Sequence, residues 1–395
     1  MRLRSASGGR KSPDFCSVHA VNQGIDIPRS PRKYINSDRS HHVLEQVTPK
    51  DDFRNMTASS PQFRTDVLTG QQVIVAPHRS HRPSAHVPDP PLSSLVDPFA
   101  EGQESETPDE RFAMRADDSE PNGPGWMLRV VSNRYPSVMP VSSLVSTTSA
   151  TDEPAMFPCW PACGEHDVVI ECPDKRSRMA ELSPAEIRQT LIAWRTRMQQ
   201  LIQSPLICSV AIFRNEGFSA GASLPHCHSQ ILATTELMPL DRLRHERAAW
   251  HRSATGRDLV QDLWDAERTH GIRVIRETPF FGVYCPFASR MSWQVRFVPK
   301  QSRPTAFADA SDEMLQDLAA LLKFTLVALE QPLGGPYSFN LTLTHARIDQ
   351  PAAFSWSLDL LPRTGRIAGW ELLTNVEIVT VPPETAAETL RFIDK

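Results

Sequence analysis

The sequence has no long apolar run, and it has few cysteines and few glycines for its length. Its most apolar helix-like stretch, residues 318–329, is short and contains Lys323, so we interpret it as a core helix and expect no membrane span. Seven cysteines among 395 residues are too sparse for a disulfide framework, which indicates reduced thiols and a cytoplasmic location. The excess of proline, 34 residues against 17 glycines, lies mostly before residue 165 and indicates a loop-rich first part.

The charge balance gives no reason to expect a polyanionic partner. Lys and Arg number 42 against 46 Asp and Glu, a formal net charge of -4, so a nucleic-acid role is disfavoured. With 40% hydrophobic residues, the chain is long enough to form two globular domains. Residues 1–56 contain few large apolar residues in any period and lack the apolar centre of a secretory signal, so we predict a disordered tail.

The rest of the chain alternates between strand-like and helix-like segments. Ser183 before Pro184, with Glu186 three residues after the serine, predicts the start of a helix. The rhythm of a sheet with neighbouring helices occurs twice, which indicates an α+β architecture of two related units. We predict strands at 72–76, 127–131, 168–171, 208–214, 293–299, 338–344 and 355–361, helices at 184–201, 312–330 and 383–393, and a long surface loop at 84–125.

The segment with the clearest chemistry is residues 221–230, Gly-Ala-Ser-Leu-Pro-His-Cys-His-Ser-Gln. On an extended backbone, His226 and His228 point to the same face. Small residues let backbone N–H groups approach a phosphate, and Ser223 and Gln230 add donors for its oxygens. A neutral imidazole is a competent nucleophile toward phosphorus. By spacing alone, the two histidines are also compatible with a metal pair or with a chance pair on the surface.

This segment resembles the His-X-His-X-Gln signature of the galactose-1-phosphate uridylyltransferases, a branch of the histidine-triad superfamily. The similarity continues in order along the chain after residue 60, through segments at 66–70, 75–83, 130–136, 167–173, 286–289, 299–300, 361–363, 368–371 and 383–387. The resemblance implies two histidine-triad-like units, each an antiparallel sheet with flanking helices. We place the catalytic unit at residues 57–238 and the second unit at residues 239–395.

The resemblance also assigns roles to individual residues. His228 matches the nucleophile that becomes nucleotidylated, Gln230 matches the glutamine that bonds the transferred phosphate, and His226 corresponds to a zinc ligand in many members. The other matches are substrate-binding positions near the phosphates or the nucleoside: Arg79, Arg82, Asn133, Asn215 and Ser223. Taken alone, each arginine is also compatible with a solvated surface charge.

The glutamine favours transfer over hydrolysis. Histidine-triad hydrolases carry a third histidine at this position, whereas the Gln230 amide exchanges no proton near neutral pH. We expect UMP to move from UDP-glucose to a hexose 1-phosphate, galactose 1-phosphate by resemblance, through a nucleotidyl-histidine. Two alternatives stay open: a phosphorylase of ADP- or UDP-sugars, and a nucleotide-sugar-binding protein without turnover. Family members are often dimers whose sites borrow residues from the neighbour, so a homodimer is a further expectation.

The sequence departs from the family at the metal positions. Where members place a Cys-X-X-Cys pair and a histidine around the first zinc, this chain has Asp97, Ala100 and Lys175. At the second metal site, three histidines are replaced by Ser302, Ser355 and Ser357. Because too few ligands remain for a tetrahedral site, we predict no metal cofactor. One alternative stays open, in which Cys159 and Cys163, near His166, act as replacement ligands.

Overall fold

A computed structural model describes residues 60–81, 97–116, 119–142, 156–300, 305–348 and 353–393. These residues lie in a unit that extends from Met56 to Lys395. The predicted tail at residues 1–56 lies outside the described residues, as do Arg82 and Ser302.

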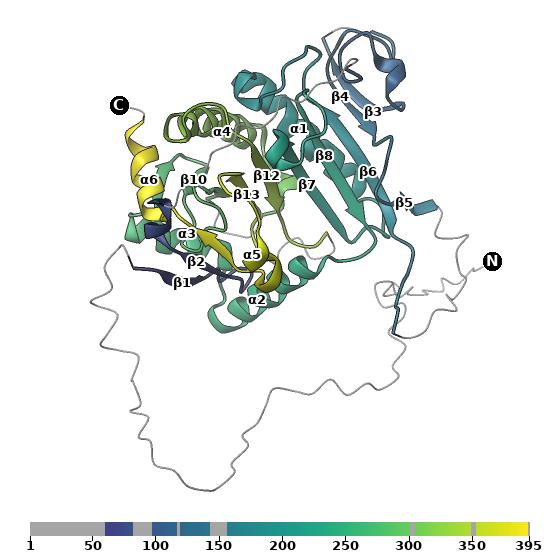
Figure 1. The fold of residues 1–395 in the computed structure, drawn as a ribbon. Helices are drawn as coiled ribbons and strands as arrows, with labels where there is room; N and C mark the ends of the chain where they lie inside the picture. The colour runs from purple at the N-terminus through teal and green to yellow at the C-terminus, as the bar shows by residue number, and fades with distance from the viewer. Residues whose placement is uncertain are drawn as a thin grey trace, which may run out of the picture. The chain divides into compact units, whose positions relative to one another are not determined.

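An eleven-stranded sheet organises the molecule (Figure 1). All of its pairings are antiparallel except that of β5 (Met139–Pro140), which pairs in parallel with β6 (Cys163–Ile170). Its strand order is β3 (Glu110–Arg115), β4 (Trp126–Ser132), β6 (Cys163–Ile170), β8 (His228–Thr234), β7 (Ser209–Glu216), β12 (Phe339–Thr344), β13 (Ser357–Pro362), β11 (Val295–Pro299), β10 (Phe281–Tyr284) and β9 (Val274–Glu277). The prediction of an α+β fold with antiparallel sheets is confirmed.

The pairing of β7 with β12 joins the two predicted units, with Asn215 opposite Asn340. A smaller sheet also combines early and late parts of the chain, since β1 (Gln62–Thr65) pairs with β2 (Gln72–Val75), which pairs in parallel with β14 (Glu377–Val379). The boundary proposed between residues 238 and 239 stays a prediction.

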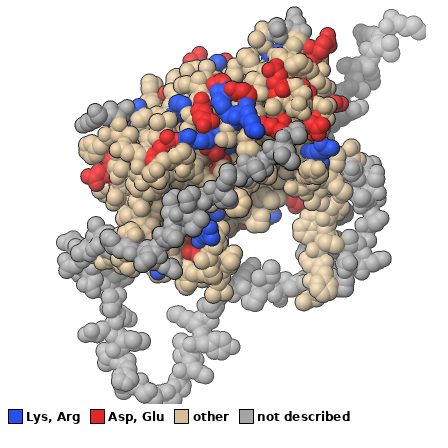
Figure 2. All heavy atoms as spheres, turned by 45° about the horizontal axis from the view of Figure 1, so that its top comes forward, with Lys and Arg blue, Asp and Glu red and all other residues tan. Residues whose placement is uncertain are grey.

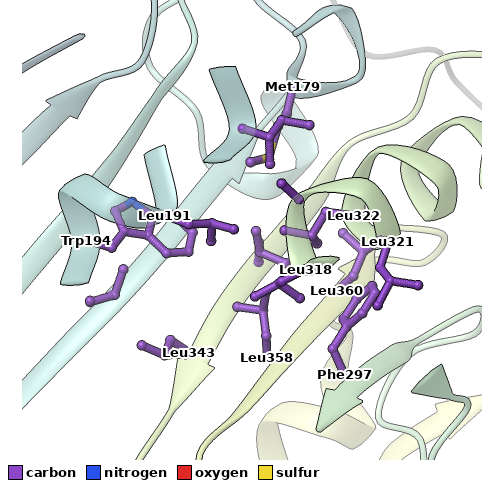
Figure 3. Close-up of a cluster of buried hydrophobic side chains, with 14 of the residues drawn as sticks. Met179, Leu191, Trp194, Phe297, Leu318, Leu321, Leu322, Leu343, Leu358 and Leu360 are labelled. Carbon is purple, nitrogen blue, oxygen red and sulfur yellow. The ribbon is translucent and has the colours of Figure 1, made fainter. Parts of the chain in front are cut away.

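Two long helices cover one face of the large sheet. Helix α1 (Pro184–Leu201) starts with the predicted capping box, in which Ser183 and Glu186 each bond the other's backbone N–H. Helix α4 (Asp312–Leu333) starts at the N-cap Ser311 and packs against α1. Figure 3 shows where these helices and the sheet meet, with Met179, Leu191, Trp194, Phe297, Leu318, Leu321, Leu322, Leu343, Leu358 and Leu360 buried together. Helix α6 (Pro383–Phe392) adds Ala386, Ala387 and Leu390 to this core.

The structure contains elements that the sequence analysis did not predict, among them the short strands β1, β9, β10 and β14 and the helix α5 (Gly369–Thr374). Helices α2 (Pro239–Thr255) and α3 (Leu259–His270) were not predicted, and α2 buries only His245 and Ala248, too little for a readable apolar stripe. The predicted loop at 84–125 contains strand β3. The short helix α5 buries none of its residues.

None of the described helices is long and apolar enough to cross a membrane. On the face drawn in Figure 2, Lys and Arg are interspersed with Asp and Glu. That face therefore offers no continuous basic surface to a nucleic acid.

Candidate active site

The candidate nucleophile His228 is the first residue of β8, on the sheet face opposite α1. Along a strand, alternate residues point to opposite faces, so His228 and Gln230 share one face and Ser229 points to the other. The Ser229 hydroxyl accepts a hydrogen bond from Trp194 Nε1 of α1 at 2.7 Å, with both residues fully buried. This bond holds β8 against the helix that backs it.

The hydrogen bonds of His228 define its tautomer. Its Nδ1 lies 2.7 Å from the backbone oxygen of His226, and a carbonyl oxygen can only accept, so Nδ1 carries the proton. The lone pair of Nε2 is therefore available. Burial lowers the pKa of His228 to about 4, and the nearby Arg214 charge acts in the same direction. His228 is thus an uncharged imidazole at neutral pH.

A buried ionic cluster lies beneath this strand. The Arg214 guanidinium contacts the Glu171 carboxylate, bonds Glu216 Oε2 at 2.8 Å, and donates to the His228 backbone oxygen at 3.3 Å. Burial alone would lower the pKa of Arg214, but the two carboxylates raise it well above its ordinary value. The permanent positive charge disfavours protonation of His228.

His226, the first histidine of the pair, is 2% exposed and bonds in two directions. Its Nε2 donates to the Cys172 backbone oxygen at 2.9 Å, and its Nδ1 is hydrogen-bonded to Asp97 Oδ2 at 2.9 Å. The Phe99 ring meets His226 and His228 edge-on, at centroid distances of 6.0 Å and 5.3 Å. Asp97 and Phe99 therefore connect the early loop to the histidine pair at the start of β8.

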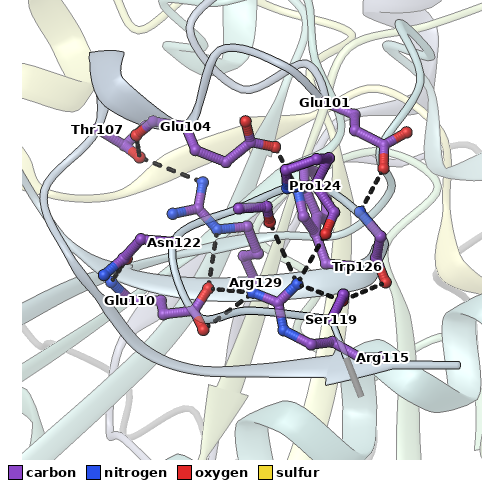
Figure 4. A network of polar contacts seen from close by, with 12 residues as sticks. Glu101, Glu104, Thr107, Glu110, Arg115, Ser119, Asn122, Pro124, Trp126 and Arg129 are labelled. Atoms are coloured by element: carbon purple, nitrogen blue, oxygen red, sulfur yellow. Dashed lines mark hydrogen bonds and ion pairs between the residues drawn. The ribbon is translucent and has the colours of Figure 1, made fainter. Parts of the chain in front are cut away.

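The loop that carries Asp97 is held by its own polar network (Figure 4). Glu104 Oε1 accepts from Trp126 Nε1 at 2.7 Å, and Glu101 Oε1 accepts from the Gly125 N–H at 2.6 Å. Arg115 binds both oxygens of Glu110 at 3.0 and 2.8 Å. The first two bonds attach the loop to the start of β4, and the third joins the two ends of β3.

The residues at the first zinc position do not fit a tetrahedral zinc site. Both ring nitrogens of His226 are engaged by an oxygen, Ala100 has no donor atom, and Lys175 is exposed. A hydrogen bond with Cys227 and burial raise the pKa of the Cys172 thiol, so it is not a ready thiolate ligand. In the part of the chain that the structure describes, no three His, Cys, Asp or Glu side chains form a group suited to a metal.

At the second metal position, the polar side chains bond to other groups of the protein. The Ser355 N–H donates to Asp258 Oδ2 at 2.9 Å, and the Ser355 hydroxyl donates to the same atom. His245, whose ring packs against Phe354 next to Ser355 at a centroid distance of 5.2 Å, accepts from the Arg347 N–H through Nε2 at 2.6 Å. The residues here do not fit an ion either, and the absence of metal from the protein stays a prediction.

Gln230 contacts a histidine for which the sequence analysis assigned no substrate role. Gln230 Oε1 lies 2.9 Å from His166 Nε2, and Asn133 Nδ2 lies 3.3 Å from the same nitrogen. The other ring nitrogen of His166 lies 3.1 Å from the Ser137 N–H, and among the described residues it forms no metal-ligand group with Cys159 and Cys163, so a role of these thiols as ligands stays a hypothesis. The structure thus brings together polar side chains from β6, from β8 and from the residue that follows β4.

The glycine-containing loop before His226 is anchored by β12. Asn340 Nδ2 donates to Asn215 Oδ1 at 2.9 Å and to the Ala220 oxygen at 3.0 Å. Gly217 has a φ of 81°, and a Cβ there would lie 1.9 Å from Ser338 Oγ, so this position requires glycine. Ser223 is exposed on the same loop. Asn340 was not predicted, because only the β7 and β12 register brings it to Asn215.

Arg79 lies apart from this cluster. It lines a hollow of about 580 Å³ together with Arg290, Arg366, Trp370 and other residues, and His228 does not line that hollow. Of the predicted substrate-binding residues, Arg79 therefore lies in a hollow that His228 does not line, whereas Asn133 and Asn215 lie in or beside the cluster around β8.

The chain is similar in sequence to known proteins. Residues 51–238 match the family described as galactose-1-phosphate uridyl transferase, N-terminal domain. The chain is 32% identical over 343 residues to ADP-glucose phosphorylase from Arabidopsis thaliana, covering 85% of this chain and 93% of that protein. It is 24% identical over 352 residues to galactose-1-phosphate uridylyltransferase from Cryptococcus neoformans, covering 83% and 89%.

A solved structure has a similar fold. The crystal structure of an ADP-glucose phosphorylase from Arabidopsis thaliana with bound ADP-glucose has a TM-score of 0.70 and 28% identity, covering 84% of this chain and 99% of that one. The fold is that of the histidine-triad superfamily. The chain belongs to the galactose-1-phosphate uridylyltransferase family, whose named relatives here are enzymes.

Proposed function

We propose that the protein transfers a nucleoside monophosphate from a nucleoside-diphosphate sugar through a covalent bond to His228. The observation that supports this most is the uncharged, buried imidazole whose Nδ1 proton is bonded to the His226 oxygen. That bond fixes the ring and leaves the Nε2 lone pair as the nucleophile. No metal enters the proposed mechanism.

The proposed reaction has two displacements at one phosphorus. In the first, His228 Nε2 forms a bond to the α-phosphorus, and the bond from that phosphorus to the bridging oxygen breaks. The oxygen keeps the electron pair and leaves on the sugar 1-phosphate. In the second, a phosphate oxygen of the acceptor attacks the same phosphorus, and the P–N bond breaks, which restores the neutral imidazole.

Polar groups around β8 would stabilise the charge that develops on the phosphoryl oxygens. Gln230 shares the sheet face of His228, and the 217–227 loop precedes it with exposed Ser223 and several backbone N–H groups. Uncharged donors held in place by a sheet stabilise such charge without reorganising. Asn133 follows the last residue of β4, and β4 lies two strands from β8 in the sheet. We propose that Asn133 contacts the nucleoside.

Two acceptors are compatible with this chemistry. A hexose 1-phosphate would make the protein a uridylyltransferase, and inorganic phosphate would make it a phosphorylase. The 32% identity to a protein named ADP-glucose phosphorylase favours ADP-sugar and inorganic phosphate as the first pair to test, beside UDP-glucose and galactose 1-phosphate.

The test of the nucleophile is covalent labelling. We would incubate the chain with UDP-glucose or ADP-glucose labelled at the α-phosphorus and expect an acid-labile, base-stable label. His228→Ala should lose the label, whereas His270→Ala, which alters an exposed histidine at the end of α3, should keep it. Label on His228→Ala would assign the nucleophile elsewhere, and binding without label would support a nucleotide-sugar-binding protein.

The acceptor is identified by a chase. The labelled, isolated protein is mixed with galactose 1-phosphate or with inorganic phosphate, and the released product is separated. A nucleoside diphosphate released by phosphate identifies a phosphorylase, and a nucleotide sugar released by galactose 1-phosphate identifies a transferase.

We also propose that the protein works as a homodimer in which Arg79 serves the partner's site. The hollow that Arg79 lines does not include His228, and the family resemblance implies shared sites. Mixing inactive Arg79→Ala and His228→Ala chains should restore on the order of one quarter of the activity, because half of randomly formed dimers contain one intact site. A mixture that stays inactive would contradict a shared site.

A further inference from the structure

His166 lies beside Gln230 in the candidate site. It is 8% exposed on β6, two residues before Val168, which pairs directly with Gln230 of β8. Residues opposite each other in an antiparallel pair point to the same face, so His166 and Gln230 share a face and meet diagonally. Their contact is 2.9 Å long.

The hydrogen bonds of His166 assign its tautomer. Its Nδ1 accepts the Ser137 N–H at 3.1 Å, so in a neutral ring the proton must be on Nε2. Nε2 therefore donates to Gln230 Oε1. The contact with Asn133 Nδ2 at 3.3 Å joins two donors and is not a hydrogen bond in this tautomer, since Asn133 Oδ1 already accepts the Tyr135 N–H at 2.8 Å.

This donation decides which end of the Gln230 amide is presented to a ligand. With Gln230 Oε1 bound to His166, the amide nitrogen of Gln230 points away from His166. Its hydrogens can then donate to a phosphoryl oxygen. Rotation of the amide by a half turn would present a carbonyl oxygen to an anion instead. Without a donor at His166, the two orientations would compete.

The same imidazole fastens the loop that follows β4. The Asn133 N–H donates to the His166 backbone oxygen at 2.7 Å, and the Ser137 N–H donates to its ring. The loop at residues 133–137 contains the proposed nucleoside contact. His166 thus joins the nucleoside loop to the phosphate-binding glutamine by one rigid side chain.

We propose that His166 is a positioning residue for nucleotidyl transfer, which fixes the amide of Gln230 and the 133–137 loop in the orientation that binds the nucleotide. The inference rests on the function proposed above. It assigns His166 a role through Gln230, and no direct contact with the reacting phosphorus is required.

Two substitutions separate the functions of the two ring nitrogens. In His166→Gln the side-chain amide nitrogen replaces Nε2 as a donor to Gln230, and in His166→Asn the amide oxygen replaces Nδ1 as an acceptor for Ser137. We expect His166→Asn to reduce the single-turnover labelling rate of His228 by roughly 10- to 100-fold, as removal of a preorganised interaction does. His166→Gln should recover most of that loss.

A double-mutant cycle tests whether the effect passes through Gln230. The labelling rates of the wild type, His166→Asn, Gln230→Ala and the double variant are compared, with thermal melting of each chain as a check of folding. We expect His166→Asn to cost little once Gln230 is absent. The control is His251→Asn. It removes a hydrogen bond between the imidazole of His251 on α2 and Asp262 on α3, and it should leave the labelling rate unchanged.

The outcomes are distinct. A wild type that acquires no label would contradict the proposed function itself. A labelled wild type with independent, additive losses in the cycle, or with His166→Gln no better than His166→Asn, would show that His166 only supports the fold and would overturn this inference.

Discussion

The Nδ1 atom of His228 lies 2.7 Å from the backbone oxygen of His226, so the first histidine of the pair fixes the tautomer of the second through its main chain and not its ring. The ring of His226 turns away and bonds Asp97 and Cys172 instead. The two imidazoles are only two residues apart, but they make different contacts. One is a candidate nucleophile and the other connects β8 to the early loop.

The first prediction concerns pH. The pKa of His228 is lowered from 6.5 to about 4, so the nucleophile should stay neutral in mild acid. At pH 5.5 an ordinary imidazole is neutral in roughly one tenth of the molecules, whereas His228 should be neutral in nearly all of them. The single-turnover labelling rate should therefore hold from pH 8 to below pH 6, and an acid limb centred near 6.5 would contradict the buried environment.

The same shift predicts the direction of one contribution to stability. Between pH 6.5 and about 4, the unfolded chain binds a proton at His228 that the folded chain does not, so this contribution is complete above pH 6.5 and is lost as the pH falls to about 4. Chemical denaturation at pH 7 and pH 5 should show a smaller difference for His228→Gln than for the wild type. An equal difference would show that His228 titrates normally.

The second prediction concerns Asp97. Asp97→Ala leaves the His226 Nδ1 without its partner in a buried position and should lower the free energy of unfolding by about 2 kcal/mol. Asp97→Asn keeps a hydrogen-bonding group at this place and should cost less. Chemical denaturation measures both, with Asp309→Ala as an exposed control. Equal losses for both Asp97 variants would indicate that the charge, and not the hydrogen bond, is what matters.

Local signals made part of this structure predictable from sequence. Ser183, Pro184 and Glu186 predict the start of α1 because a capping box is formed by residues near one another in the chain. The His-X-His spacing likewise predicted that His226 and His228 share one face of an extended segment, and strand alternation puts Gln230 on the face of His228 in β8. Both inferences need only the geometry of one helix or one strand.

Contacts made across the sheet were beyond such reasoning. His166 meets Gln230, 64 positions later, only because β6 and β8 pair in one register. A shift of one residue would turn His166 to the other face. Arg79 was expected near the phosphates, and the chain places it in a separate hollow, which no local pattern could indicate.

The third prediction concerns the loop before the histidine pair. Gly217→Ala would place a Cβ 1.9 Å from Ser338 Oγ, and Gly256→Ala, at a similar positive φ, would meet nothing within 4 Å. Alanine at a positive φ is strained at both positions, by on the order of 1 to 3 kcal/mol, but only the first also displaces the loop. We expect Gly217→Ala to lose labelling and more stability, and Ser338→Gly to restore part of both. Equal effects of the two alanines would show that the contact with Ser338 is unimportant.

The last prediction concerns metal. The Asp97 loop is already fixed by direct bonds from Asp97 to His226 and from Glu104 to Trp126, and Asp258 bonds Ser355 at the second position. Proteins with structural zinc lose folding free energy when a chelator removes the ion. We expect elemental analysis to find well under one zinc or iron per chain, and prolonged EDTA treatment to change neither the melting temperature nor the labelling rate.

Two variants distinguish the explanations should metal be found. Stoichiometric zinc that is lost in Asp97→Ala would mean that the ion replaces the hydrogen bond between Asp97 and His226. Zinc that is lost instead in Cys159→Ser or Cys163→Ser would mean that these thiols regroup as ligands. Either result would contradict the prediction, because the donor set around His226 consists of one imidazole and one carboxylate that already bond each other, which is two ligands short of a closed tetrahedral site.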